Sequence, residues 1–309
     1  MLWVILAIIG AISNAAYFIV IRTYITTRDP RILTSLGFLI SGVLLLLISS
    51  AMGFPVIGPS LYTAVIISGI LNIIGLSLIF RAMESSEMSL SMPMLSFTPV
   101  FLIGTSSIFL HEMPSLAGIA GICIIVSGSY VLNISGEHEH FLEPIRSMVE
   151  NRGSWYMLIV ALLFAASINY DKIAMLNSDP VFGMAFTLLI ISMAFTVIVV
   201  LSKKSAGSCP PSYTKEDMSP SGHHAESYLS LRPYLVPALL IGLFASAECV
   251  SINIAYTLQI TPYVIAIKRL SIIFLVLYGT FICGENKIRT RLLGAILMVG
   301  GAVIILLSA

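Results

Sequence analysis

The stretch FTPVFLIGTSSIFLHEMPSLAGIAGICIIVSGSYVL, residues 97–132, consists of two apolar runs separated by the short segment HEMPS. Its only acidic or basic residue, histidine aside, is Glu112. The two runs belong to apolar blocks at 89–110 and 115–134. A helix of about 20 apolar residues crosses a hydrocarbon layer of ~30 Å. Because hydrocarbon offers no partner to a free N–H or C=O group, we expect each block to be a membrane-spanning α-helix.

The rest of the chain has the same character. Of its 309 residues, 58% are hydrophobic and 10% are charged, and the mean hydropathy is +1.00. These charges are too few to cover the surface of a water-soluble domain of this size. Ten apolar blocks are present, at 2–21, 33–53, 60–82, 89–110, 115–134, 154–175, 181–201, 233–257, 262–283 and 289–308. The sequence therefore predicts an all-α membrane protein with ten transmembrane helices.

The connections between the expected spans differ in their basic residues. Those after the first, third, fifth, seventh and ninth spans hold most of the 16 Lys and Arg residues, namely Arg22, Arg28, Arg31, Arg81, Arg146, Arg152, Lys203, Lys204, Lys215, Arg232, Lys287, Arg289 and Arg291. The opposite side, which includes both termini, holds only Lys172. Because basic loops remain in the cytoplasm, we expect these connections to be cytoplasmic, both termini to lie outside, and the chain to reside in the plasma membrane.

Two connections, at 135–153 and 202–232, are long and polar. The first contains EHEH (137–140), and the second contains His223 and His224. These residue types can bind a metal, but a solvated polar loop is the simpler interpretation. We therefore predict neither a metal site nor a cofactor, and the net charge of +1 predicts no nucleic-acid partner.

The two halves of the chain resemble each other. A shift of residues 60–134 by 173 positions superimposes several identical residues: Gly69 on Gly242, Ala82 on Ala255, Phe101 on Phe274, Leu102 on Leu275, Glu112 on Glu285, Gly121 on Gly294, and Gly128 on Gly301. Each half has five expected spans, and an odd number inverts the second half relative to the first. Two inverted halves around a midplane site are typical of secondary transporters.

The matched residues predict structural roles. Small residues let helix backbones approach closely in lipid, so the glycines of 116–133 and 289–308 are expected to pack helices. Glu112 and Glu285 end their spans at the membrane boundary, and we expect them to cap or anchor the next helix.

Residues 97–132 and the stretch VIAIKRLSIIFLVLYGTFICGENKIRTRLLGAILMVGGAVIIL (264–306) each resemble the end of an EamA repeat, the unit of the drug/metabolite transporter superfamily. The resemblance implies two inverted five-helix repeats, 1–134 and 154–309, joined by a cytoplasmic linker at 135–153. It also implies alternating access and a central cavity lined mainly by the first, third, fourth, sixth, eighth and ninth spans. The Lys268–Arg269 pair resembles the Lys-Arg pair with which organic-phosphate members hold anions.

A few charges lie inside the expected spans, where each costs at least ~2.5–3.5 kcal/mol. They are Glu248, Lys268, Arg269, Asp171 and Lys172. At ~1.5 Å per residue, Glu248 and Lys268 lie at similar depths in consecutive antiparallel helices, which predicts a contact between them. Two interpretations remain open. Lys268 or Arg269 binds a substrate carboxylate or phosphate while Glu248 orients it or carries a proton, or Glu248 and Lys268 form a structural pair.

Uncharged polar residues form a weaker set of candidates for a binding site: Asn14, Tyr17, Asn72, Asn169, Tyr170, Asn253 and Tyr256. Amides and phenols hydrogen-bond directionally without the cost of a charge, although each of them can equally join two helices. Asn14 and Asn169 are favoured because the two halves place them at related positions. Pro93, Pro99 and Pro262 are expected to interrupt or open helices and are candidates for gating.

These observations predict a secondary active transporter for a small organic metabolite, driven by a proton or substrate gradient. The two cations favour an anionic substrate. The alternative is a non-transporting membrane scaffold or partner subunit, which leaves the charges within the spans unexplained. An intramembrane enzyme is disfavoured because the spans carry no catalytic motif. The expected partners are the lipid bilayer, the metabolite and a coupling proton, and a homodimer is left open.

Overall fold

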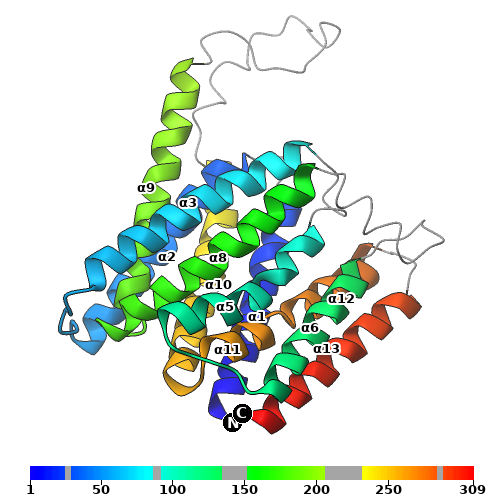
Figure 1. Cartoon of the computed structure of the whole chain (residues 1–309). Coiled ribbons are helices and arrows are strands. Elements are labelled where there is room, and N and C mark those ends of the chain that lie inside the picture. The colour runs from blue at the N-terminus through cyan, green and yellow to red at the C-terminus, as the bar shows by residue number, and fades with distance from the viewer. Residues whose placement is uncertain (25–28, 86–91, 134–151, 206–231, 284–287) are drawn as a thin grey trace, which may run out of the picture.

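The structure, a computed structural model, describes residues 1–24, 29–85, 92–133, 152–205, 232–283 and 288–309 (Figure 1). Every regular element in these ranges is helical. The elements are α1 (Leu2–Tyr24), α2 (Pro30–Met52), α3 (Leu61–Ser85), the 3₁₀ helix η1 (Met92–Phe97), α5 (Thr98–Phe109), α6 (Leu116–Asn133), α8 (Arg152–Leu176), α9 (Phe182–Ser205), α10 (Arg232–Leu258), α11 (Thr261–Lys268), α12 (Ser271–Cys283) and α13 (Ile288–Ser308). EHEH, His223, His224 and Glu285 lie outside the described residues.

The helices have the length and composition of membrane spans. Within the described ranges, seven helical stretches are long and apolar enough to cross a bilayer, and three shorter apolar helices accompany them. Many large apolar side chains face outward, among them Leu47, Ile66 and Leu243. Such a surface is unfavourable in water and favourable in lipid. The prediction of an all-α, multi-pass membrane protein is confirmed.

Two of the expected spans are interrupted: the first interruption, near Pro93 and Pro99, was predicted, and the second corrects the sequence-based boundaries. Block 89–110 divides into η1 and α5, and block 262–283 divides into α11 and α12, separated by a turn at Arg269–Leu270. The new helices begin at Thr98 and Ser271, which are separated by the same 173 positions that relate the two halves of the sequence.

The backbone hydrogen bonds explain the second interruption. The Leu270 amide donates to the Ile267 carbonyl (3.0 Å) rather than to the residue four positions before it, and the Ile273 amide donates to Leu270 (2.9 Å). These are the tighter bonds of a 3₁₀ turn. At the start of α5, Pro99 occupies the first turn, where its missing N–H group costs nothing.

Helices from the first half of the chain pack against helices from the second half (Figure 1). The most extensive contacts join α6 with α13, α3 with α8, α1 with α10, and α2 with α9. Helix α5 packs on α8, and α11 and α12 both contact α1. The two termini lie at the same end of the bundle (Figure 1). Helix α11, which ends at Lys268, is therefore surrounded by helices far from it in sequence.

The contact between α6 and α13 depends on two pairs of glycines. A Cβ atom added to Gly301 would lie 2.6 Å from the Gly121 carbonyl oxygen, and one added to Gly121 would lie 2.8 Å from the Gly301 oxygen. Gly128 and Gly294 show the same reciprocal approach, at 2.7 and 2.8 Å. The predicted role in close helix packing is confirmed for these four glycines and is wrong for Gly300, where an added Cβ atom meets nothing within 4 Å.

We expect Gly301→Ala to destabilise the folded protein by about 1–3 kcal/mol, because the added methyl group must separate two backbones in contact. The neighbouring Gly300 provides a matched control, since a Cβ atom there meets nothing within 4 Å. Gly300→Ala should leave stability unchanged or raise it slightly, as alanine favours helix. Thermal unfolding in detergent measures both, and equal effects of the two variants would contradict the packing role.

Candidate functional site

An ion pair joins α10 to the end of α11 in the interior of the bundle. Lys268, the last residue of α11, pairs with the carboxylate of Glu248 from α10. The second carboxylate oxygen of Glu248 accepts a hydrogen bond from Asn14 Nδ2 of α1 (3.0 Å). The side chains of Lys268 and Glu248 are 26% and 15% exposed. The contact predicted from helix depth is present, and Asn14 belongs to it.

The helix interruption determines what surrounds this ion pair. Because α11 ends at Lys268, the chain turns at Arg269 within a stretch apolar enough to span the membrane. Arg269 Nε is buried and lacks a hydrogen-bond partner among the described residues. Its guanidinium lies within electrostatic range of Glu248. The Lys268–Glu248 ion pair thus lies beside an irregular stretch of backbone, with a second cation, Arg269, within electrostatic range of the carboxylate.

Aromatic residues border the ion pair on the α1 side. Tyr17 lies one turn beyond Asn14 and within electrostatic range of Glu248. Its ring stacks on Phe38 of α2, with the centroids 6.4 Å apart, and meets Phe18 edge-on at 5.2 Å. These rings give the predicted site an apolar wall beside its charges.

A second polar group joins α3 and α8. Ser68 donates a hydrogen bond to the Asp171 carboxylate, and its oxygen lies 2.9 Å from that of Ser167. Asn72 Nδ2 donates to the oxygen of Ser167 (2.6 Å). Asp171 lies within electrostatic range of Lys268. The structure therefore brings Asn72 and Asp171 together, and it places two serines between them that the sequence did not single out.

Three other predicted residues make no hydrogen bond or ion pair with Glu248 or Lys268 among the described residues, although Tyr256 lies within electrostatic range of Glu248. Asn169 donates to the Ala165 carbonyl of its own helix (2.9 Å), and its Oδ1 atom is buried without a partner among the described residues. The Tyr170 ring packs against Phe109, with centroids 5.3 Å apart. The Tyr256 ring lies beneath the ammonium group of Lys172, which is 5.9 Å from the ring centroid.

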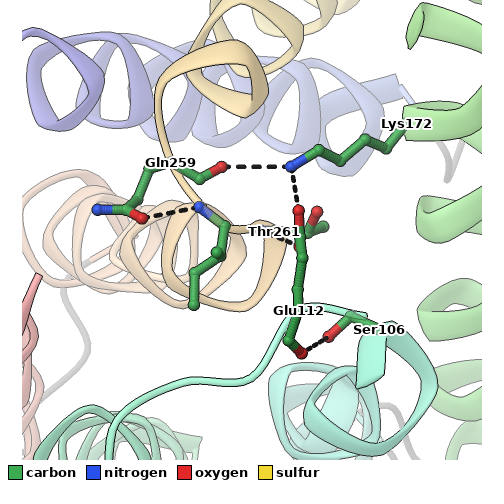
Figure 2. Close-up of polar contacts among 6 residues, drawn as sticks. Ser106, Glu112, Lys172, Gln259 and Thr261 are labelled. Atoms are coloured by element: carbon green, nitrogen blue, oxygen red, sulfur yellow. Dashed lines mark hydrogen bonds and ion pairs between the residues drawn. The ribbon is translucent and has the colours of Figure 1, made fainter. Parts of the chain in front are cut away.

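A second ion pair joins Glu112, in the segment between α5 and α6, to Lys172 of α8 (Figure 2). Lys172 also donates to the Gln259 carbonyl at the end of α10 (3.4 Å). Glu112 accepts from the Thr261 amide at the start of α11 (2.8 Å). A cation thus meets a helix C-terminus and an anion meets a helix N-terminus, which both helix dipoles favour.

The backbone before Glu112 sets the position of its side chain. His111 has a φ of 55°, the left-handed conformation that often ends a helix. The Glu112 amide then donates back to the Ser106 carbonyl (3.2 Å), and the Ser106 hydroxyl donates to the Glu112 carbonyl (3.5 Å) (Figure 2). Glu112 does cap a helix, as predicted. That helix is α11 rather than the next one in sequence, and the pairing with Lys172 was missed.

Comparison with known proteins adds a family assignment. The model of the EamA-like transporter family matches residues 1–134. Residues 1–134 are similar to the EamA-like transporter family. The resemblance stated from the sequence is confirmed for this part of the chain.

Other comparisons bear on the fold of the whole chain. A crystal structure described simply as that of a protein superposes with a TM-score of 0.74 at 15% sequence identity, covering 98% of this chain and 99% of the other. No curated protein matches the sequence. The fold of the whole chain, both halves included, is therefore shared with that structure.

The three prolines singled out from the sequence lie at the starts of helices or within the 3₁₀ helix. Pro99 is in the first turn of α5, Pro262 is in the first turn of α11, and Pro93 falls within η1. Pro262 opens its helix as predicted. The gating role of all three prolines stays a prediction.

We expect Glu112→Gln to destabilise the protein by about 3 kcal/mol or more, because it leaves the Lys172 ammonium buried without a counter-ion. The double variant Glu112→Gln/Lys172→Met should be less destabilised than Glu112→Gln alone, since it removes both charges. Thermal unfolding of the two single variants and the double variant measures the coupling. Purely additive effects would show that the two side chains do not interact.

Proposed function

We propose that this EamA-like protein is a secondary active transporter that moves a small anionic metabolite by alternating access. The observation that carries this proposal is the Lys268–Glu248–Asn14 group at the interruption between α11 and α12. Charged side chains inside spans are costly and usually mark a substrate or ion pathway. Irregular backbone within a span is likewise tolerated only where protein or a water-filled cavity surrounds it.

The chemistry of the group favours an anion. Lys268 supplies three N–H donors and Arg269 a planar array suited to a carboxylate or phosphate. In the empty protein Glu248 neutralises Lys268. An incoming substrate anion replaces the Glu248 carboxylate as the partner of the Lys268 ammonium group. Asn14 keeps its hydrogen bond to the displaced carboxylate. Tyr17 gives the apolar part of the metabolite a surface to pack on.

The proposed architecture is ten spans in two inverted five-helix units, 1–134 and 154–309, with a linker at 135–153 and a long loop at 202–232. Three observations support it. The helix starts at Thr98 and Ser271 are related by the repeat spacing. The glycine contacts between α6 and α13 are reciprocal. The contacts of α3 with α8 and of α1 with α10 correspond when the units are exchanged.

The proposed location is the plasma membrane, with the odd-numbered connections in the cytoplasm and both termini outside. The excess of Lys and Arg on these connections supports this orientation. The position of the two termini at one end of the bundle supports an even number of crossings (Figure 1).

A reporter enzyme active only in the cytoplasm tests the orientation. We expect no activity when it follows Ala309, because the C-terminus is outside, and full activity when it follows Arg81 at the end of α3. Activity after Ala309 and none after Arg81 would invert the proposed topology. Activity at both positions would overturn the even number of crossings.

We expect Lys268→Met to remove ligand binding while the protein still folds. The purified protein is screened by thermal shift against amino acids, sugar phosphates and organic anions, since a ligand that binds the folded state raises its melting temperature. Loss of a charged hydrogen bond weakens binding by about 1.5–3 kcal/mol, or roughly 10–100-fold. Uptake of the same compound into proteoliposomes should fall in parallel.

Two variants make this test specific. Lys268→Arg keeps the charge and should retain part of the ligand-induced shift. Lys172→Met removes another paired lysine, in contact with Glu112 rather than Glu248, and should lower the melting temperature while keeping the shift. Unchanged binding in Lys268→Met would remove this residue from the site. The absence of any ligand and any uptake would favour the scaffold alternative.

A further inference from the structure

We infer that Asp171 is a proton-binding site and that its proton balances the charge of the anionic substrate. This inference rests on the proposed transport function and adds to it the identity of the coupling ion. The site is Asp171 of α8 with Ser68 and Asn72 of α3 and Ser167 of α8.

The three carboxylates described above differ in their partners. Glu248 pairs with Lys268, and Glu112 pairs with Lys172. Asp171 accepts a hydrogen bond from the Ser68 hydroxyl group, and among the described residues no Lys, Arg or His nitrogen lies within ion-pair distance of it. A carboxylate within a span that lacks a contacting cation is the one that accepts a proton at the smallest cost.

The neighbours of Asp171 suit both of its protonation states. When Asp171 is ionised, Asn72 donates to Ser167, Ser167 donates to Ser68, and Ser68 donates to the carboxylate. A hydroxyl group is both donor and acceptor. When Asp171 is protonated it can therefore donate to Ser68, which turns its own proton toward Ser167, while the Ser167 hydroxyl proton rotates away from Ser68. No side chain has to leave its place, whereas a lysine partner would be left with an uncompensated charge.

The titratable groups around Asp171 come from several helices. Lys268 of α11 and the Tyr256 and Cys249 side chains of α10 all lie within electrostatic range of the Asp171 carboxylate. Tyr170 and Lys172 adjoin it on α8, where Lys172 is engaged by Glu112. From α3, Ser68 brings a hydroxyl group to Asp171, and the Asn72 amide lies behind it on Ser167.

Charge balance connects this proton to transport. Asp171 and the neighbouring Glu248, Lys268 and Arg269 together supply two carboxylates and two cations. Their charges cancel when Asp171 is ionised and no substrate is bound. Binding of a monovalent anion adds one negative charge, which protonation of Asp171 cancels. A net charge enclosed in hydrocarbon is costly. The carrier therefore changes the side to which its site opens in two states: without substrate and with Asp171 ionised, or with substrate bound and Asp171 protonated. The result is symport of one proton with one anion.

Infrared difference spectroscopy of the purified protein tests the site without any substrate. On acidification we expect the wild type to gain a protonated-carboxyl band that is lost in Asp171→Asn and retained in Glu248→Gln. Ser68→Ala, which keeps Asp171, should move the band to higher frequency because its hydrogen bond is lost. A band that persists in Asp171→Asn, or that ignores Ser68→Ala, would overturn the inference.

Transport measurements separate the coupling from the proposed function. For a compound that passes the Lys268 test, an inward proton gradient should increase uptake by wild type and leave uptake by Asp171→Asn unchanged, while exchange of internal for external compound persists. Gradient-driven uptake by Asp171→Asn would overturn the coupling but leave the transporter standing. Absence of transport together with an Asp171 band would overturn the proposed function and leave the proton site.

Discussion

Hydrocarbon cannot solvate a charge, so every ionic side chain within a span must find its partner in the protein. In this chain the requirement connects distant segments. Glu248 and Lys268 tie α10 to the end of α11, and Glu112 and Lys172 tie the segment after α5 to α8. The two ion pairs lie at opposite ends of one helix, since Lys268 ends α11 and Glu112 caps its start. The same short helix thus has a charged contact at each end.

Packing and chemistry occupy different parts of the molecule. The α6–α13 contact is made of glycines and apolar side chains, and its backbones touch. The polar groups instead lie on α1, α3, α8, α10 and α11. Helices that touch through their backbones have little freedom to slide, whereas helices joined by hydroxyls, amides and ion pairs can exchange partners at small cost. This division suits a carrier, which needs a constant frame beside a site that rearranges.

Much of this arrangement could be predicted from the sequence because it depends on composition and spacing. Apolar blocks located the helices, and helix rise placed Glu248 opposite Lys268. The interruption after Lys268 could not be found in this way, since hydropathy averaged over a span does not register one irregular turn. Nor could the pairing of Glu112 with Lys172 or of Asp171 with Ser68, because these contacts depend on how each helix is rotated about its axis. The interruption nevertheless follows the repeat, because α12 begins at Ser271, 173 positions after α5 begins at Thr98.

The mutual fit of α6 and α13 has a consequence for how such a chain can be divided. Each helix offers the other a glycine beside a carbonyl, and then offers it again seven residues along. The fit depends on the two surfaces and needs no covalent link between them. A polypeptide cut between α6 and α8 would leave each fragment with the surface that recognises the other, so two separately translated chains could assemble into one carrier.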